Sequence, residues 1–263
     1  MRRQQKWNLK DGVAELNGPS FGLKIDASTP ALGGKVVFSK TADKSDPDAA
    51  LFQVRSSVDE ANGDSKKAVA ETVETYCRGR DLISRYVADS EDPIAREIYW
   101  RLVEESAELS DQVVSVETIY SLQTDLLDSA PQPSVPSVFS NASNRWFLAH
   151  DAGTDDEISW SECSWEDACF ASGEGGGRVA CLIVFSEGDT LLQTVYPSDL
   201  RGVEINVTGQ QTEIHWGLRS DFLEKGVIRR LRLLTVMGGD DSTEKDLLDA
   251  ASQFYRSELP LTV

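Results

Sequence analysis

Apolar and polar residues alternate along two segments of this chain, and this two-residue period constrains the fold more than any other feature. Between residues 112 and 124, Val114, Val116 and Leu122 fall on one face and polar residues on the other. The segment 227–236 alternates in the same way. Successive side chains of a β-strand point to opposite faces of a sheet, so both segments are predicted to be strands. We expect the first to be half-buried, with its polar face in solvent.

Shorter strand patterns occupy much of the remaining chain. A hairpin is predicted around the tetrapeptide 78–81, where a glycine supplies the backbone angle that a tight turn needs. The segment 97–105 fits a helix or a strand, and we favour a strand. The segment 130–137 contains three prolines in eight residues, which predicts a stiff crossover between sheets. The segment 157–177 ends in a glycine run that predicts a flexible loop.

One helix is clearly predicted, and it comes last. Thr243 can cap its first turn, with Asp246 three residues later and Pro260 beyond its end. Its apolar stripe consists of Leu247, Leu248, Ala251, Phe254 and Tyr255. We expect this helix to dock against a sheet. These patterns predict a mainly β protein, a large antiparallel β-sandwich with one C-terminal helix, in which residues 1–263 form a single domain.

The charge balance excludes several partners. A formal net charge of −18 repels DNA, RNA and anionic membrane surfaces. No apolar run reaches the roughly 20 residues that span a bilayer, so we expect no membrane insertion. The N-terminal segment lacks the apolar stretch of a secretory signal, so a cytoplasmic location is expected.

The cysteines and glycines match no cofactor motif. No Cys-x-x-Cys pair is present among Cys77, Cys163, Cys169 and Cys181, so no structural metal is expected. The glycine run lacks the spacing of a phosphate-binding loop, and the chain has no dinucleotide fingerprint, nucleophile elbow or metal-binding His-Glu-x-x-His helix. We therefore expect no cofactor.

Residues able to bind a polar ligand concentrate immediately before the second alternating segment and at its start. This clustering makes the segment 214–236 the predicted site, although its spacing matches no motif that dictates a chemistry. The candidate ligand-binding residues are Trp216, Arg219, Asp221, Lys225 and Arg229, and the candidate acid–base residues are His215 and Glu224.

The chemistry of these residues leaves alternatives open. The chain has two histidines, and His215 is a better general acid or base than His150, unless it is simply a solvent-facing strand residue. Arg229 shares a strand face with leucines, so it either pairs with an internal carboxylate or binds an acidic ligand. Asp221 and Glu224 could form the carboxylate pair of a glycosidase, but acids are abundant in this chain and make such pairs common.

Three segments resemble an uncharacterised bacterial, chiefly planctomycetal, family: YCRGRDLISRY (76–86), TDLLDS (124–129) and FLEKGVIRR (222–230). The β-rich order with one late helix is similar to the galactose mutarotase-like supersandwich of sugar epimerases. Mutarotases use a histidine acid and a glutamate base on adjacent strands. The resemblance assigns neither role to a residue of this chain.

The resemblance implies a saccharide ligand. The leading hypothesis is a carbohydrate-binding protein with little or no catalysis. One alternative is an aldose or sugar-phosphate epimerase that uses His215 and Glu224, with nearby arginines holding an acidic substituent. The other alternative is a protein–protein interaction module that binds its partner through a sheet face.

Overall fold

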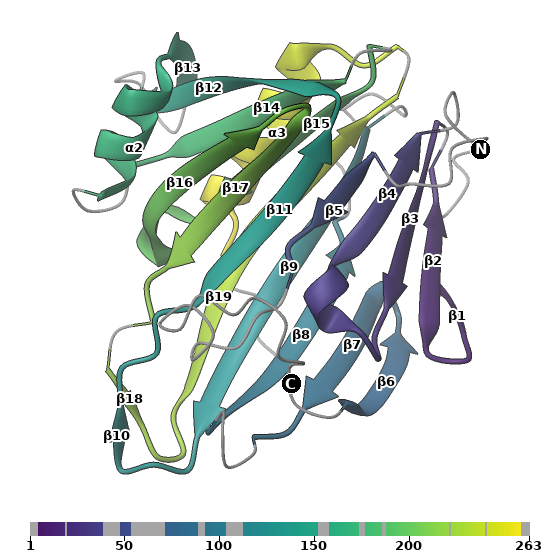
Figure 1. The fold of residues 1–263 in the computed structure, drawn as a ribbon, viewed down its shortest axis with the longest axis vertical. Coiled ribbons are helices and arrows are strands. Elements are labelled where there is room, and N and C mark those ends of the chain that lie inside the picture. The colour runs from purple at the N-terminus through teal and green to yellow at the C-terminus, as the bar shows by residue number, and fades with distance from the viewer. Residues whose placement is uncertain are drawn as a thin grey trace.

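Two large antiparallel sheets form most of the structure and pack face to face (Figure 1). The computed structural model describes residues 5–18, 20–38, 48–53, 72–88, 93–103, 113–151, 158–173, 177–185, 188–220, 222–239 and 241–258. Strands predominate among these residues, and helix α3 (Glu244–Arg256) lies near the C-terminus. The predicted fold class, a mainly β sandwich with a C-terminal helix, is therefore confirmed.

Sheet A joins the first five strands of the chain to three strands from later in the chain. In spatial order its strands are β1 (Asn8–Lys10), β2 (Val13–Asn17), β3 (Phe21–Asp26), β4 (Gly34–Phe38), β5 (Ala49–Leu51), β11 (Ser134–Ser140), β17 (Gln211–Leu218) and β16 (Leu200–Thr208). The proline-rich segment 130–137 follows β10 (Asp128–Ser129) and includes the first four residues of β11, so it carries the chain from one sheet to another, as predicted.

Sheet B is the larger of the two. In spatial order its strands are β13 (Ile158–Cys163), β12 (Ala142–Asp151), β14 (Val179–Phe185), β15 (Thr190–Val195), β19 (Ile228–Gly238), β9 (Val113–Thr124), β8 (Ile94–Leu102), β7 (Asp81–Tyr86) and β6 (Thr72–Arg78). The predicted hairpin is confirmed in β6 and β7, where Gly79 has a φ of 61°. Strand β8 confirms that the ambiguous segment 97–105 begins as a strand.

Four short elements complete the described structure outside the two helices. Strands β10 (Asp128–Ser129) and β18 (Leu223–Glu224) form a two-stranded sheet at one end of the sandwich (Figure 1). The 3-10 helices are η1 (Pro30–Leu32) and η3 (Pro197–Asp199).

The main core lies between the two sheets. The rings of Phe38 in sheet A and Phe185 in sheet B have centroids 4.8 Å apart, and those of Trp216 and Trp146 are 6.0 Å apart. The buried Trp216 indole donates to Gln193 Oε1 at 3.1 Å, so its polar atom is satisfied inside the core. Contacts of this kind from both sheets make one continuous apolar layer.

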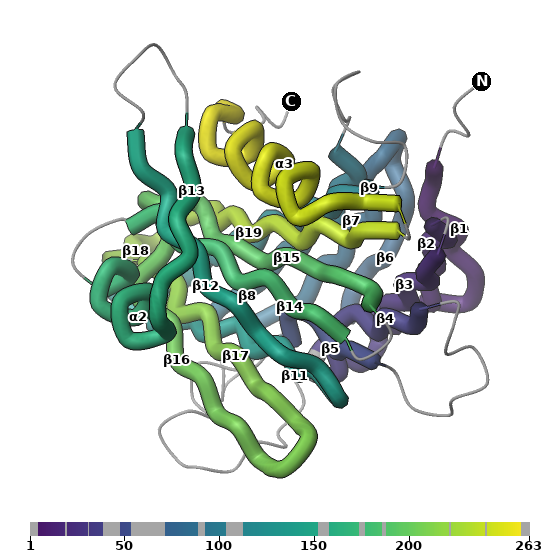
Figure 2. The backbone as a smooth tube through the Cα atoms, turned by 90° about the horizontal axis from the view of Figure 1, so that it is seen from above, coloured from purple at the N-terminus to yellow at the C-terminus, as the bar shows by residue number. Residues whose placement is uncertain are grey.

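Helix α3 covers the face of sheet B that points away from sheet A (Figure 2). Its predicted cap is confirmed, because Thr243 and Asp246 form a reciprocal capping box. Its apolar stripe packs on Leu234 and Val236 of β19. Strand β9 is consequently buried on both faces, with Gln123 its one exposed residue. The expectation that β9 is half-buried was wrong, because α3 lies over the face that the alternation left polar.

A second helix was not predicted. Helix α2 (Trp165–Gly173) lies in the segment 157–177, where the one structural prediction was a flexible loop at the glycine run 173–177. Only Ala168 and Ser172 of this helix are buried, so it has no apolar stripe to reveal it. Its start is marked by Ser164, whose Oγ accepts from the backbone N–H three residues later at 3.1 Å. Neither helix in the described part of the chain is long and apolar enough to cross a membrane.

Candidate functional site

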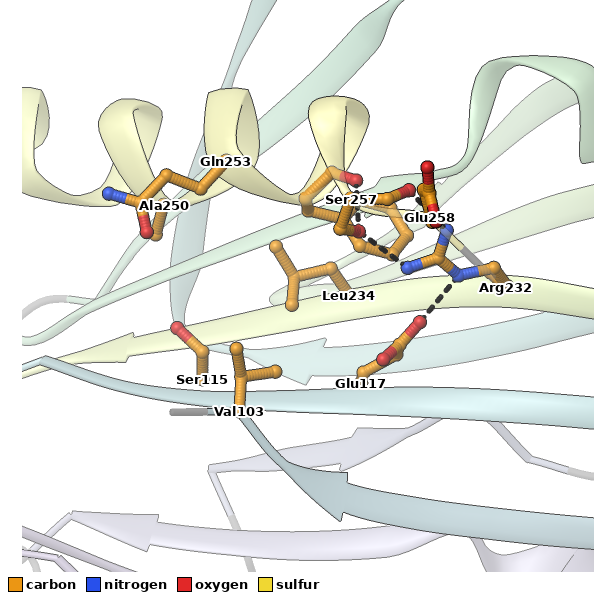
Figure 3. A pocket seen from close by; sticks show the side chains of 10 residues that line it. Val103, Ser115, Glu117, Arg232, Leu234, Ala250, Gln253, Ser257 and Glu258 are labelled. Carbon is orange, nitrogen blue, oxygen red and sulfur yellow. Dashed lines mark hydrogen bonds and ion pairs between the residues drawn. The ribbon is translucent and has the colours of Figure 1, made fainter. Parts of the chain in front are cut away.

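A pocket of ≈ 250 Å³ lies between α3 and the outer face of sheet B (Figure 3). Its lining combines apolar side chains with carboxylates, hydroxyls, an amide and one guanidinium. The lining residues are Val103, Ser115, Glu117, Arg232, Leu234, Ala250, Gln253, Phe254, Ser257 and Glu258. This mixture of apolar walls and a few polar groups is typical of small-molecule sites.

The alternation of the strands places the polar groups on the pocket side. Ser115 and Glu117 lie two residues apart on β9, so both point toward α3, as Figure 3 shows. Arg232 and Leu234 have the same spacing on β19, where Leu234 is the direct cross-strand neighbour of Glu117. The helix then supplies the opposite wall.

Arg232 lies on the sheet side of the pocket and is extensively hydrogen-bonded. Its Nε lies 2.5 Å from Glu117 Oε1, and Nη1 and Nη2 donate to the carbonyl and hydroxyl oxygens of Ser257 at 3.0 and 2.6 Å. Its guanidinium also lies over the rings of Tyr196 and Phe254, at 4.7 and 4.8 Å. A buried charge is tolerated when it is paired and hydrogen-bonded in this way. Arg232 therefore holds the end of α3 against the sheet.

The hydroxyl of Ser115 is the unsatisfied group in the pocket. Ser115 is 3% exposed, and its Oγ has no hydrogen-bond partner in the described part of the chain. An unpaired buried hydroxyl costs about 1–3 kcal/mol. Glu117 provides a second free position, because among the described residues its hydrogen bond goes to Arg232 alone, through one of its two carboxylate oxygens. A ligand with hydroxyl or amine groups would satisfy both residues.

The charges around the pocket determine which ligands it suits. The cation of Arg232 is already balanced by Glu117, and the exposed Glu258 adds another carboxylate to the lining. A further anion in the pocket would therefore meet a surplus of negative charge. Neutral hydroxyl groups and ammonium groups are the favoured ligand chemistry.

The predicted acid–base residues lie away from this pocket. His215 sits on the partly exposed outer face of sheet A, where its Nε2 is 3.3 Å from Glu213 Oε1 and its cross-strand neighbour is Glu204. Glu224 is exposed in β18. Within the described ranges, no hydrogen bond or ion pair joins His215 to Glu224. Epimerase chemistry through this pair stays a prediction.

Trp216 points to the opposite side of β17 from His215. Its side chain is completely buried, against Trp146 and Gln193 between the two sheets. This tryptophan is part of the core, and the structure does not present its ring on a surface where a sugar could stack.

Two of the predicted ligand-binding arginines meet around a buried carboxylate. Arg229 Nη2 lies 3.4 Å from Asp199 Oδ1 and 3.4 Å from the carbonyl oxygen of Arg219. The backbone N–H of Arg219 donates to the carbonyl oxygen of Asp199 at 2.7 Å. Burial raises the pKa of Asp199 above its usual value, while the Arg232 backbone N–H and Arg229 oppose this shift. Of the two roles predicted for Arg229, the structure shows the internal ion pair.

The remaining predicted residues stay separate from this cluster. Lys225 is exposed in the turn between β18 and β19, which Gly226 makes possible with a φ of 81°. Asp221 lies outside the described residues. The predicted segment 214–236 therefore distributes its candidate side chains over sheet A, the core, an internal ion pair and an exposed turn.

Sequence reasoning missed the residues that line the pocket. Ser115 and Glu117 were assigned to a solvent-facing side of β9, and Arg232, although inside the predicted segment, was not among the candidate ligand-binding residues. The available signal was the apolar stripe of the last helix, which has to cover a sheet face. The second face of β9 carries small and polar residues and lies beside Arg232. This face was a suitable partner for the apolar stripe of the helix.

Comparisons with known proteins do not assign a family. No family model matches the chain, and no curated protein matches it in sequence. Among the residues that the structure describes, no group of three or more histidine, cysteine, aspartate or glutamate side chains could hold a metal ion.

Proposed function

We propose that this chain is a carbohydrate-binding protein with a galactose mutarotase-like β-sandwich, and that it binds a small hydroxyl-rich ligand between α3 and sheet B with little or no catalysis. The observation that carries the proposal is the buried Ser115 hydroxyl, which faces the pocket without a partner. Glu117 adds an acceptor on the same strand face, and Gln253 adds an amide from the helix.

The size of the pocket supports a ligand no larger than about one sugar ring. Its volume of ≈ 250 Å³ is below the roughly 300–1,000 Å³ of sites for drug-sized molecules. Apolar side chains such as Leu234 and Phe254 can cover the carbon face of a monosaccharide, while the polar residues bind its hydroxyl groups. The surplus of carboxylates favours neutral and amino sugars over sugar acids and sugar phosphates.

The carboxylate of Glu117 is better suited to binding than to proton transfer. One of its oxygens is held by the guanidinium of Arg232 at 2.5 Å, so half of the carboxylate is already committed to an internal ion pair. The pocket lining contains no imidazole to serve as the partner acid. Ligand recognition without turnover is the simplest activity for this set of groups.

A thermal-shift screen followed by calorimetry tests the proposal. The panel contains neutral, amino and acidic sugars and sugar phosphates, and a ligand at about 100 times its Kd should add about 2.7 kcal/mol of stability. We expect neutral or amino sugars to raise Tm and the anionic sugars to leave it unchanged. A flat response across the panel refutes carbohydrate binding.

A matched pair of serine variants locates the site. Ser115→Ala should weaken the binding of the identified sugar about two- to tenfold, the value of one hydrogen bond. Ser121→Ala is the control, because Ser121 lies on the same face of β9, is also buried and unpartnered, and is outside the pocket lining. Equal effects of the two variants would place the sugar elsewhere.

A further inference from the structure

Exposed apolar side chains gather at one end of the sandwich. Of the eleven large hydrophobic residues that are exposed in the described part of the chain, five lie in the segments 125–128 and 222–228. They are Leu126, Leu127, Phe222, Val227 and Ile228, and Leu127 is 85% exposed. We call these two segments the tip. Scattered exposed apolar residues are normal, but a concentration of this kind marks an interaction site.

The fold brings the two segments together although they are far apart in the sequence. Asp128 pairs with Glu224 and Ser129 with Leu223 across β10 and β18, which project from one corner of the molecule in Figure 1. The backbone N–H of Gly226 also donates to the Thr124 carbonyl oxygen at 3.4 Å. The tip is therefore a hydrogen-bonded structure on which side chains have defined positions.

The alternation of β18 explains why the tip is apolar on its outside. Leu223 is 1% exposed and anchors the strand in the core, and its carbonyl oxygen accepts from Ser129 Oγ at 3.1 Å. Its neighbours Phe222 and Glu224 therefore point outward, and Phe222 is 58% exposed. Because Leu223 points inward, Phe222 has to point toward solvent. The exposure of its ring is unfavourable unless a partner covers it.

The charges of the tip indicate what kind of partner fits. Asp128 and Glu224 are direct cross-strand neighbours, and like charges in these positions destabilise a strand pair. Asp125 adds a third carboxylate, against the single cation of Lys225. A lysine or arginine side chain placed between the two opposed carboxylates would relieve their repulsion.

We propose that the tip is a docking surface for a polypeptide segment that carries basic and apolar side chains together. The apolar residues of the partner segment cover Leu127 and Phe222, and its basic side chains bind between Asp128 and Glu224. A second copy of this chain fits poorly, because both copies would present carboxylates and a net charge of −18. The same carboxylates oppose an anionic membrane.

Peptide selection tests the chemistry of the partner. A phage-displayed library of random peptides is depleted on the Leu127→Ser/Phe222→Ser variant and then selected on the unmodified protein. We expect the enriched peptides to combine lysine or arginine with leucine or aromatic residues. Lack of enrichment, or enrichment of peptides without basic residues, would overturn the proposal.

Fluorescence anisotropy with an enriched peptide then locates the contact. We expect affinity to fall at least tenfold in Leu127→Ser/Phe222→Ser and in Asp128→Asn/Glu224→Gln, and to weaken with salt. Phe170→Ser is the control, because Phe170 is 67% exposed on α2, away from the tip. All substitutions are at exposed positions. If the Leu127→Ser/Phe222→Ser variant fails to fold, the Asp128→Asn/Glu224→Gln variant tests the site independently. Equal affinity in the tip variants and the control contradicts the proposal.

Two further measurements separate the rival occupants. Sedimentation velocity that shows a dimer lost in the tip variants would assign the surface to a second copy. Flotation with phosphatidylcholine–phosphatidylserine vesicles that depends on Leu127 and Phe222 would assign it to a membrane. Either result overturns the proposal. Sugar-induced thermal shifts should be unchanged in the tip variants, so failure of the docking proposal is distinguishable from failure of the proposed function.

Discussion

Arg232 of β19 and Glu117 of β9 form an ion pair in which the side chains are 2% and 6% exposed. The pair lies between sheet B and α3, and the same guanidinium binds both oxygens of Ser257 at the end of the helix. Two charges removed from water in this way contribute little net stability together, but each makes the other indispensable. The relationship also fixes one wall of the candidate pocket.

Removing one partner of this ion pair should be strongly destabilising. We expect Arg232→Met to lower the free energy of unfolding by about 3–5 kcal/mol, because Glu117 is left buried without its cation. The double variant Glu117→Met/Arg232→Met should recover much of this loss. Urea unfolding measures both, with Arg178→Met as the control, since Arg178 pairs at the surface with Asp151 and should change stability by at most about 1 kcal/mol. A small effect of Arg232→Met alone would show that the pair is not held in a dry interior.

Asp199 should give stability a specific dependence on pH. Burial raises its pKa above the unfolded value of 3.8, so the folded state binds this proton more tightly than the unfolded state does. Its contribution to stability is therefore fully present below the unfolded pKa and is lost as pH rises through the folded pKa. The stability of the protein relative to Asp199→Asn should fall as pH rises from about 4 and then level off. A difference that grows with pH would show that the contact with Arg229 outweighs burial.

The capping box of α3 should be measurable by substitution at Thr243. Its Oγ1 accepts a hydrogen bond from the Asp246 backbone N–H at 3.3 Å, and Asp246 Oδ2 accepts one from the Thr243 backbone N–H at 2.8 Å. Thr243→Ala should cost about 1 kcal/mol and lower Tm by a few degrees. Thr243→Ser keeps the hydroxyl and should stay close to the unmodified protein in calorimetry. If both variants melt together, the cap does not contribute.

The four thiols should react with alkylating reagents at very different rates. Cys181 is completely buried in β14, and burial raises its pKa well above its usual value, so both access and ionisation are suppressed. Cys77 is exposed, although burial of part of its surroundings also raises its pKa. We expect native-state iodoacetamide to modify Cys77 first and Cys181 only after unfolding, as read by peptide mass spectrometry. Comparable rates at the two positions would contradict the sandwich core.

Strands were predictable from this sequence where one periodic pattern determined them. The alternation over 112–124 corresponds to β9 (Val113–Thr124), and the cap and stripe after residue 243 correspond to α3. The burial of β9 was not predictable from β9 itself, because the element that covers its second face lies more than one hundred residues later in the chain. Helix α2 escaped prediction because a nine-residue helix with two buried positions has no stripe.

The candidate site was less predictable than the fold. Neighbouring residues of a strand point to opposite faces, so His215 faces outward from sheet A while Trp216 enters the core. Predicted residues that are neighbours in the sequence therefore lie on opposite sides of the sheet. Ser115 lies more than one hundred residues before Arg232 and Gln253, and only the pairing of β9 with β19 and the docking of α3 bring the three to one pocket.

The central place of β19 in sheet B has a consequence for biosynthesis. Strand β19 is inserted between β15 and β9, both of which leave the ribosome earlier. A nascent chain that still lacks residues 228–238 has open, apolar edges on both of these strands, and such edges invite pairing with other chains. Folding of sheet B must wait until β19 is synthesised, more than one hundred residues after β9, so we expect slow folding and a dependence on chaperones in the cell.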